Sequence, residues 1–419
     1  MRILVVSDLY PPATLGGYEV AAGEVAGALA QRGHDVWVLT TDAYAAGVAE
    51  LPRVVRGLRT RLGTRPGALA LGGEARRQAD DRRVIARMQA EARPDVVFLW
   101  NVGGISHHAL ARLMNGPVPT VIYVFGDWPL RKFLQPQDLD PWAGLFAART
   151  EAPWRRTARA AFAAYARARG VTTGAAPLRF DHMEFGSRFM MDALHRGGFA
   201  MRGSERLIYY GLFGEYARAA AEPLAPRDPA GRRLLFVGRL WEAKGAHTVV
   251  EAAGLLRHRG ETAVSLTIAG PEEQPEYVAA LRRRVHALGL DGGVHWAGAV
   301  PRDAVLDLYR RHDAVVFAST YPEPFGIVQL EAMAAGCAVV GTGTGGSAEI
   351  LDPESNALTF RPGDADHLAG QLLRLWRDPS LVDRLRAGGQ RTVCSRFLGE
   401  RMVDEIEAHL NEIVRGGGR

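Results

Sequence analysis

Cysteine and lysine are scarce in this sequence of 419 residues, and long hydrophobic runs are absent. The only cysteines are Cys337 and Cys394, which excludes a disulfide framework or a cysteine-rich zinc cluster. No apolar run approaches the roughly 18 residues that a membrane-spanning helix needs. The opening MRILVVSDLYPP is typical of a strand and a loop, not of a signal peptide. Together these absences predict a cytoplasmic protein.

Lysine occurs only at positions 132 and 244, and the other 49 of the 51 basic residues are Arg. Because the chain otherwise favours Arg, the compact ammonium of Lys244 marks a candidate functional position. Residues 1–200 carry 25 basic and 18 acidic side chains, whereas the remainder carries 26 and 28. This excess is too small and too dispersed to indicate nucleic-acid binding. The length predicts two domains of about 200 residues each.

Strands that alternate with helices predict an α/β protein with two parallel sheets. In the N-terminal half, the expected strands are 3–7, 35–40, 95–100, 120–125, 183–187 and 207–211, and the expected helices are 19–31, 74–92 and 105–114. In the C-terminal half, strands at 234–237, 265–269, 294–296, 314–318 and 338–340 alternate with helices near 247–258, 275–288, 303–311 and 326–335. Ligands are expected at the C-terminal ends of such strands.

Three other segments do not belong to these two series. Residues 51–93 contain 11 Arg and 4 acidic residues, which predicts a mobile loop followed by a solvated helix from residue 74. Residues 222–231 are a predicted Pro-rich linker, and a helix at 400–414 is expected to pack back across the structure. Residues 131–180 include the basic stretch RRTARAAFAAYARARG. That helix could rest on an anionic membrane, but a packed arm with a solvated face is the favoured interpretation.

The stretch from Tyr321 to Gly346, YPEPFGIVQLEAMAAGCAVVGTGTGG, is typical of half a nucleotide site. A turn leads into a predicted helix that ends at Gly336, and a short buried strand and a glycine-rich loop follow. The N–H groups at the start of this helix would face an anion. Glu323 precedes the helix and Glu331 lies about one turn inside it, so each could bind a hydroxyl-rich group on one side of a diphosphate. A surface helix with a capping acid and one solvated Glu is the alternative.

Two glycine-containing turns also suit an anionic ligand. Gly238 and Arg239 directly follow the strand at 234–237, and Lys244 lies five residues further on. A forked guanidinium and a point-charge ammonium at the edge of a parallel sheet could hold a diphosphate. Gly16 and Gly17 precede the first helix, where small residues let the backbone approach a ligand closely. A plain turn is the alternative at that position.

Three further motifs do not support the chemistry that they resemble. Gly341, Gly343 and Gly346 fit the dinucleotide pattern G-x-G-x-x-G but do not open a βαβ unit. The pair Asp138 and Asp140 imitates a metal-binding triplet yet lies in a Pro-rich loop. The adjacent histidines at 107 and 108 would point in different directions on a helix, which favours a surface pair over metal ligands.

The motifs in this order resemble glycosyltransferase family 4, whose members are retaining enzymes of the GT-B fold. GRLWEAKG is followed about 80 residues later by EPFGIVQLE and then by GTGTGGSAEIL, as in that family's C-terminal domain. PPATLGGYEVAAGEVAGALAQRGHDVWVLT resembles the family's opening. The resemblance covers roughly residues 1–40, 94–130 and 183–410.

The resemblance implies a role for each matching position. Arg239 and Lys244 would neutralise the leaving diphosphate, and Glu323 would lie near the transferred sugar. Glu331 would bind the ribose of the nucleotide. The remaining donor-binding positions would be Gly16, Gly17, Gly238, Glu349 and the amides of Phe325, Gly326 and Ile327.

One departure from the family concerns the N-terminal domain. The family usually carries a His in a stretch resembling His-Asp-x-Trp-Pro-Leu, whereas this chain has Phe125-Gly126-Asp127-Trp128-Pro129-Leu130. Asp127 is therefore the candidate catalytic acid of this segment, with a turn-capping role as the alternative. The missing His also leaves open a catalytically impaired protein that binds a sugar nucleotide. A sugar-nucleotide epimerase of the same architecture is a further alternative.

The prediction is a GT-B fold of two Rossmann-like domains that face each other across a cleft. Residues 1–205, joined by the returning helix 400–415, would bind the acceptor, and residues 206–399 would bind the donor. The enzyme would move a sugar from a UDP- or GDP-sugar to a hydroxyl of a small-molecule, glycan or glycolipid acceptor. No cofactor or metal is expected, because fixed cations already neutralise the leaving group.

Overall fold

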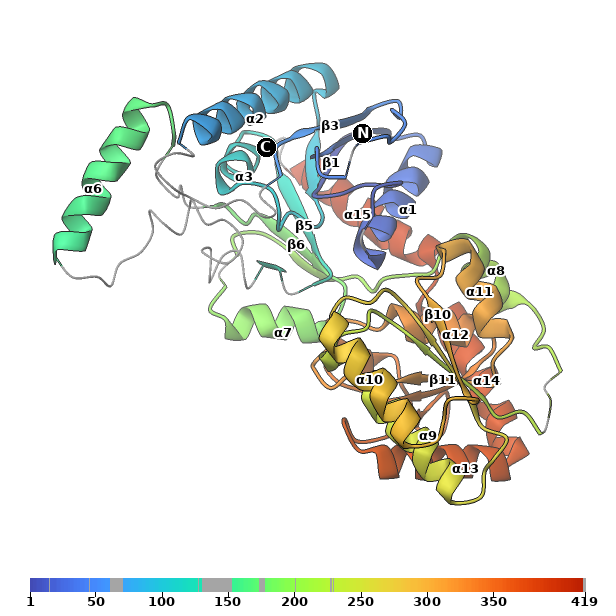
Figure 1. Cartoon of the computed structure of the whole chain (residues 1–419). Helices are drawn as coiled ribbons and strands as arrows, with labels where there is room; N and C mark the ends of the chain where they lie inside the picture. The colour runs from blue at the N-terminus through green and yellow to red at the C-terminus, as the bar shows by residue number, and fades with distance from the viewer. Residues whose placement is uncertain are drawn as a thin grey trace. The chain divides into compact units, whose positions relative to one another are not determined.

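The structure is a computed structural model of the whole chain (Figure 1). It describes residues 1–14, 16–44, 46–60, 71–126, 128–129, 153–172, 178–199, 201–226, 228 and 230–416. The chain forms two compact units, Met1–Ile208 with Val403–Arg419 and Tyr209–Met402. The predicted boundary between residues 205 and 206 would cut through a strand that completes the first unit's sheet.

The first unit contains a seven-stranded parallel sheet in the order β3-β2-β1-β4-β5-β6-β7. Its strands are β1 Arg2–Ser7, β2 Asp35–Thr41, β3 Val54–Leu58, β4 Val96–Leu99, β5 Thr120–Val124, β6 His182–Phe185 and β7 Glu205–Leu207. Strands β1, β4 and β5 are buried at almost every position, as expected for strands covered on both faces. The predicted fold class, α/β with parallel sheets, is therefore confirmed for this unit.

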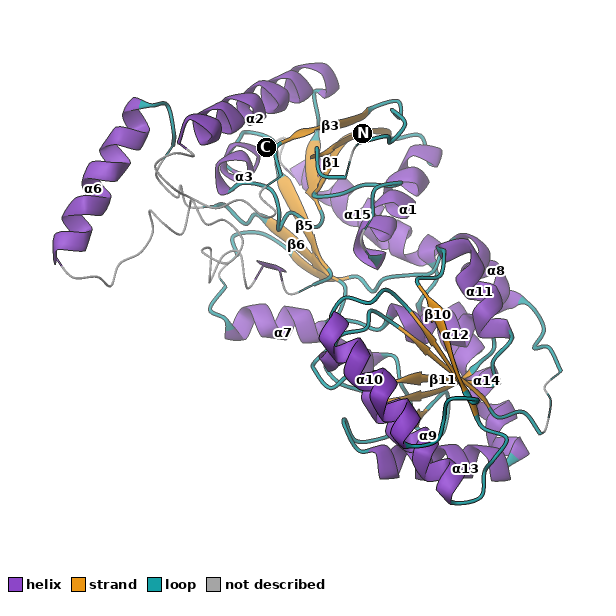
Figure 2. Ribbon diagram, in the orientation of Figure 1, coloured by secondary structure: helices purple, strands orange, loops and turns teal. Residues whose placement is uncertain are grey.

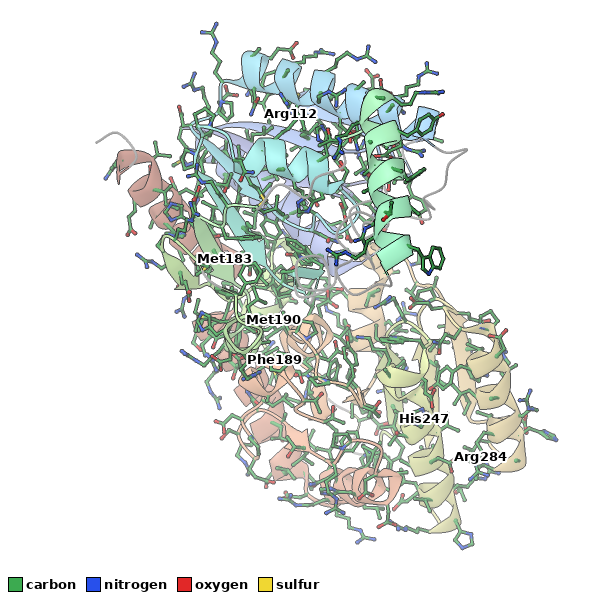
Figure 3. All side chains as sticks on the ribbon, turned by 90° about the vertical axis from the view of Figure 1, so that its left-hand side faces the viewer. Arg112, Met183, Phe189, Met190, His247 and Arg284 are labelled. Atoms are coloured by element: carbon green, nitrogen blue, oxygen red, sulfur yellow. The ribbon has the colours of Figure 1, made fainter. Side chains whose placement is uncertain are left out.

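Helices flank this sheet (Figure 2). They are α1 Gly17–Gln31, α2 Leu71–Ala92, α3 His107–Met114, α7 Arg188–Arg196 and α15 Gly399–Gly416. Helix α6 Pro153–Ala168 also belongs to this unit but does not cover the sheet. Met183 of β6 and Met190 of α7 are both fully enclosed in the core (Figure 3). The same core takes apolar residues from the loop after β4 and from α2 and α3.

Three predictions for the first unit were wrong in detail. The segment predicted as a loop from residue 51 contains edge strand β3, whose only fully buried residue is Leu58, so no apolar run marked it. Helix α2 is not simply solvated, because Ile85 and Met88 are buried in the core. The strand expected at 207–211 lies earlier, at β7.

The last helix, α15, completes the first unit although it follows the second unit in the chain. His409 of α15 lies 2.8 Å from Glu184 of β6, measured from Nδ1 to Oε1. Arg32 at the end of α1 binds Glu407 with Nη1 2.7 Å from Oε2. These contacts confirm the prediction that the C-terminal helix packs back onto the N-terminal domain.

The second unit contains a six-stranded parallel sheet in the order β10-β9-β8-β11-β12-β13. Its strands are β8 Arg233–Val237, β9 Ser265–Ala269, β10 Val294–Gly298, β11 Ala314–Phe317, β12 Ala338–Gly341 and β13 Leu358–Thr359. Five of them match the predicted strands, and the two-residue β13 is too short to produce a sequence signal.

The helices and turns of this unit are α8 Gly214–Ala221, η3 Glu242–Lys244, α9 Ala246–His258, α10 Pro275–Ala287, α11 Arg302–Arg310, α12 Ile327–Ala334, η4 Gly346–Glu349, α13 Ala365–Arg377 and α14 Pro379–Arg396. Arg284 of α10 and His247 of α9 (both labelled in Figure 3) each bridge the two helices. Arg284 Nη2 lies 2.7 Å from Glu251 Oε2, and His247 Nδ1 lies 3.0 Å from the Tyr277 hydroxyl. Helices α13 and α14 add apolar residues to the core around the sheet.

Each sheet reverses its strand order once, beside the strand that opens it. In the second unit the chain runs from β8 outward to β9 and β10, then returns to the other side of β8 as β11. Loops after β8 and β11 therefore leave the same edge in opposite directions, which is where ligands bind in open α/β sheets. The corresponding point in the first unit lies between β1 and β4.

Helix α6 confirms the predicted basic helix at 155–170. Ala166 is buried together with Val171, while Trp154 and Tyr165 are 68% and 47% exposed. One side of the helix is thus packed and another faces solvent. Within the described ranges, no helix is both long and apolar enough to cross a membrane.

Candidate functional site

Glu323 and Lys244 form a partly buried ion pair at the point where the second sheet reverses. Lys244 Nζ lies 2.6 Å from Glu323 Oε1, although the two residues are 79 positions apart. The side chains are only 18% and 6% exposed. Glu323 also accepts hydrogen bonds from the hydroxyls of Ser319 and Tyr321, the latter 2.6 Å from Oε2. The structure thus brings together two of the predicted site residues.

The ion pair forms because the turn after β8 approaches the end of β11 closely. Gly245 has φ of 75°, and a Cβ at this position would lie 1.9 Å from the carbonyl oxygen of Ala318. Only glycine fits such a contact in the left-handed region. Thr320 N then donates to Ala243 O at 2.9 Å. The turn is therefore fixed with Lys244 beside the loop that carries Glu323.

The glycine-rich loop after β12 closes the other side of Glu323. Gly346 N donates to Glu323 O at 2.7 Å, and the hydroxyl of Thr344 donates to Tyr321 O at 2.9 Å. Gly345 has φ of 61°, and a Cβ there would lie 2.4 Å from Glu323 O. The loops after β8, β11 and β12 consequently form one hydrogen-bonded unit around the Glu323 carboxylate.

Helix α12 begins beside this carboxylate. Gly326 is its N-cap, and Ile327 is its first residue. The first N–H groups of a helix have no acceptor within the helix and carry partial positive charge. Phe325 is buried and stacks on Tyr209, with ring centroids 6.1 Å apart. The helix start is thus held in place next to two charged groups, an arrangement suited to an anion.

Glu331 is buried on the inner face of α12, where it already has two protein partners. Its Oε2 accepts from the Tyr309 hydroxyl at 3.0 Å, and its Oε1 lies 3.2 Å from Arg302 Nη1. Burial and the charge of Glu331 raise the pKa of Tyr309 well above its usual value, so Tyr309 stays a protonated donor. An ionised carboxylate has about four lone-pair sites and could still accept from a ribose hydroxyl.

Arg239 is not joined to the Lys244–Glu323 pair. Its Nη1 lies 2.9 Å from Glu273 Oε1, and its guanidinium carbon lies 5.7 Å from the centre of the Trp241 ring. The Arg239 side chain is 48% exposed. Gly270 lets its loop approach Gly238 closely, because a Cβ at position 270 would lie only 1.9 Å from the carbonyl oxygen of Gly238. Arg239 would have to leave Glu273 to bind a phosphate.

Glu349 is turned toward an aromatic residue. It ends η4, and its Oε2 accepts from the Tyr209 hydroxyl at 2.8 Å. The structure therefore places Glu349 in the loop predicted to line the donor site, but with its carboxylate bound to Tyr209.

The predicted site residues of the first unit lie at the point where its sheet reverses. Gly16 is the N-cap of α1, and its N–H donates to Glu19 Oε2 at 2.9 Å; Gly17 opens the helix. Glu19 is buried and also accepts from Asn101 Nδ2 at 3.2 Å. Asp127 lies outside the described residues, as do Asp138 and Asp140.

Four functional candidates were missed from the sequence: Ser319, Tyr321, Arg302 and Tyr309. Ser319 and Tyr321 flank the predicted Glu323, and their closeness in the chain was the available signal. Arg302 and Tyr309 lie on α11 and reach Glu331 only because α11 packs beside α12. No group of three or more His, Cys, Asp or Glu side chains that could hold a metal occurs in the described part of the chain.

Two family models match the chain in succession. "Glycosyltransferase Family 4" matches residues 15–188, and "Glycosyl transferases group 1" matches residues 225–392. Glycogen synthase of Mycobacterium tuberculosis is 28% identical over 95% of this chain and 91% of its own length.

Solved structures show the same fold along the whole chain. Sucrose-phosphate synthase from Thermosynechococcus elongatus has a TM-score of 0.69 at 19% identity, covering 99% of both chains. Anabaena Alr3699/HepE in complex with UDP-glucose has a TM-score of 0.65 at 17% identity, covering 98% of this chain and 99% of the other.

Proposed function

The chain is a glycosyltransferase of the family 4 type with the GT-B fold, and we propose that it transfers a sugar, with retention, from a nucleoside-diphosphate sugar to a hydroxyl of a small-molecule or glycan acceptor. The observation that carries this proposal is the partly buried Lys244–Glu323 pair beside the start of α12. One point charge and the first amides of a helix suit a diphosphate. A neighbouring carboxylate suits the hydroxyls of the attached sugar.

In the proposed reaction, Lys244 exchanges its partner. The ammonium moves from Glu323 Oε1 to the diphosphate, where it stabilises the negative charge that develops as the sugar leaves. The bond between the anomeric carbon and the phosphate oxygen breaks, and the electron pair stays on that oxygen. The acceptor hydroxyl attacks from the same face, and its proton passes to the departing phosphate.

The other predicted positions complete the donor site in this proposal. Glu323, still oriented by Ser319 and Tyr321, binds a hydroxyl of the transferred sugar. Arg239 leaves Glu273 to reach the diphosphate, and Glu331 binds the ribose. The remaining predicted donor contacts come from Gly16, Gly17, Gly238, Glu349 and the amides of Phe325, Gly326 and Ile327, while Asp127 acts at the reacting sugar.

The proposal requires no metal, because Lys244, Arg239 and the helix start supply fixed positive charge. Activity should therefore survive EDTA. Complete loss with EDTA, restored by magnesium or manganese, would instead assign a role to Asp138 and Asp140.

A donor panel tests the proposal. UDP-glucose is the first donor to try, because the related Anabaena structure contains it; other UDP-sugars and GDP-sugars follow. The cognate donor should raise the melting temperature in a dose-dependent way, and slow hydrolysis should release a sugar of the donor's own anomeric configuration. A product of inverted configuration would exclude retention, and an epimerised sugar nucleotide would indicate an epimerase. Binding without turnover would indicate an impaired enzyme.

A further inference from the structure

A cavity lies at the opposite edge of the second sheet from Glu323 and Lys244. Its volume is about 170 Å³, and its lining includes residues that immediately precede β8, β11 and β12. Glu323 and Lys244 instead follow β11 and β8, at the C-terminal ends of those strands. The cavity is therefore separate from the proposed donor site.

The cavity is bounded by ordered contacts and is not a gap under a loose loop. Residues 222–226, the first part of the segment 222–231 that was predicted as a linker, form one wall. Arg386 of α14 ties this segment to the turn between α12 and β12, because its Nε donates to Gly336 O at 2.6 Å and its Nη2 to Ala225 O at 2.8 Å. Leu224 packs against Gly336, where a Cβ would lie 2.7 Å from Leu224 Cδ2. The predicted linker is thus part of a built site.

Among the described residues that line the cavity, one arginine has no acidic partner. Arg233 Nη2 lies 2.8 Å from Asp313, and Arg310 Nη2 lies 2.8 Å from Glu222. Arg232 Nε lies 3.7 Å from Glu261. The third lining carboxylate, Asp228, accepts from Ala230 N at 2.9 Å.

Arg386 differs from these three arginines. Its printed hydrogen bonds go to two main-chain carbonyls, and no carboxylate of the described residues lies within ion-pair distance of it. A cation that is bound only by carbonyl dipoles attracts an anion more strongly than one already paired.

Trp376 of α13 offers a second polar group. Its Nε1 is buried and has no acceptor among the described residues, although it belongs to a side chain that lines the cavity. Arg232 lies over the Trp376 ring, with its guanidinium carbon 5.0 Å from the ring centre. Buried donors normally find an acceptor, and an acidic ligand in the cavity would supply one. Leu375 and Val382 add apolar surface nearby.

We propose that this cavity binds a small organic monoanion, a carboxylate attached to an apolar body about the size of one aromatic ring. The carboxylate is held by the Arg386 guanidinium and accepts from Trp376 Nε1, and the apolar body contacts Leu224, Leu375 and Val382. This site is independent of the proposed donor site. Its volume is below the usual range for drug-sized ligands, which fits a small acid.

The test uses benzoate as the probe and benzamide as its neutral counterpart, with the full-length chain and isothermal titration. Benzoate should bind to the wild type and benzamide should not. Arg386→Gln, which keeps a donor toward Gly336 O but removes the charge, should weaken benzoate binding by about tenfold or more. Arg384→Gln is the matched control, because Arg384 lies on the same helix, is not among the lining residues and also donates to a carbonyl, Glu354 O, at 3.2 Å.

Two further variants keep the proposal falsifiable if Arg386→Gln does not fold. Trp376→Phe keeps a ring under Arg232 but removes the donor, and should also weaken benzoate binding. Lys244→Ala should leave it unchanged, which separates this cavity from the donor site. Absence of benzoate binding, equal binding of benzamide, or a loss in Lys244→Ala would overturn the proposal.

Discussion

At the scale of single residues, the Glu323 carboxylate is the best-defined feature of the site. It is buried, and it has three side-chain donors, one of them charged. Removing one partner of a buried ion pair is costly because the other charge is left uncompensated. A ligand that binds Lys244 in place of Glu323 must therefore offer Glu323 a hydrogen-bond donor that replaces the ammonium. A sugar with hydroxyl groups next to a diphosphate meets both demands.

Lys244→Ala should lower kcat by about 10²-fold or more, because it removes the charge that stabilises the leaving diphosphate. Lys244→Arg should also lose activity, since a planar fork does not replace a point charge in a tight site. Steady-state kinetics with the cognate donor measure both effects, and melting temperatures identify any loss of stability. An alanine variant with wild-type kcat would show that the lysine has no part in the reaction.

Arg239→Ala should also reduce kcat by about 10²-fold if this residue leaves Glu273 during the reaction. The chain offers a closely matched control. Arg282 Nη2 lies 2.8 Å from Glu272 Oε1, and the Arg282 side chain is 50% exposed. The corresponding values for Arg239 are 2.9 Å, from Nη1 to Glu273 Oε1, and 48%. Each exposed pair is worth at most about 1 kcal/mol, so neither variant should change stability much. Equal kcat values for Arg239→Ala and Arg282→Ala would assign Arg239 to the surface.

At the scale of elements, three loops at one sheet edge determine the site. Each loop begins where a parallel strand ends. Neighbouring loops contact each other through their backbones at glycine positions, where a side chain would clash. Gly245 meets Ala318, and Gly345 meets Glu323. Isolated loops of this kind have no fixed conformation, so the position of Glu323 depends on the loops on both sides of it.

Gly345→Ala should destabilise the protein and lower kcat, because its Cβ would lie 2.4 Å from Glu323 O and 2.8 Å from Glu323 N. Gly343→Ala places a side chain at a positive φ in the same loop without this clash. Gly343 has a similar φ of 57°, but its nearest neighbour would lie 3.8 Å away. The Gly343 variant should cost about 1 kcal/mol of stability and leave kcat nearly unchanged. Thermal unfolding and kinetics on both variants provide the comparison, and similar kcat values would contradict the proposed role of the contact with Glu323.

At the scale of the whole molecule, the last helix links the end of the chain to its first unit. Glu184 of β6 is fully buried and bound to His409, whose Nε2 lies 2.6 Å from the Ser204 hydroxyl. Burial raises the pKa of Glu184 to about 6, and the hydrogen bond to His409 and the nearby Arg206 only partly oppose this rise. The connection between helix and sheet thus contains a carboxyl group that titrates in a mildly acidic range.

Glu184 should make stability fall as pH rises from about 4.5 to about 7. Its pKa is raised from 4.5 when unfolded to about 6 when folded, so the folded state holds the proton more tightly. The contribution of Glu184 to stability is full below pH 4.5 and is lost as pH rises through 6, by about 2 kcal/mol. Glu184→Gln should remove this pH-dependent part of the free energy of unfolding, measured from denaturant-unfolding curves between about pH 4.5 and 7. Glu205→Gln, which alters an exposed Glu–His pair in the same unit, is the control. An unchanged pH profile in Glu184→Gln would contradict this assignment.

The sequence by itself determined the alternation of strands and helices and the family 4 resemblance. It also identified the strand ends that carry Lys244, Glu323 and the glycine loop. These features are local, because buried parallel strands are short apolar runs and glycines mark tight turns. Edge strands such as β3 and β13 were missed because they lack such a run, and β7 was placed too late in the chain because it is only three residues long.

Only the tertiary structure decided which of these residues meet. Lys244 reaches Glu323 because β11 returns beside β8, which fixes the contact between residues far apart in the chain. The same packing places Arg239 in an ion pair with Glu273, and it places Glu331 within hydrogen-bonding distance of Arg302 and Tyr309. The spacing of these residues in the sequence does not indicate either pairing. The packing also placed residues 222–226, part of the predicted linker, in the wall of the cavity that Arg386 lines. Side-chain partners depend on strand order and helix packing, and these are set by burial over the whole domain.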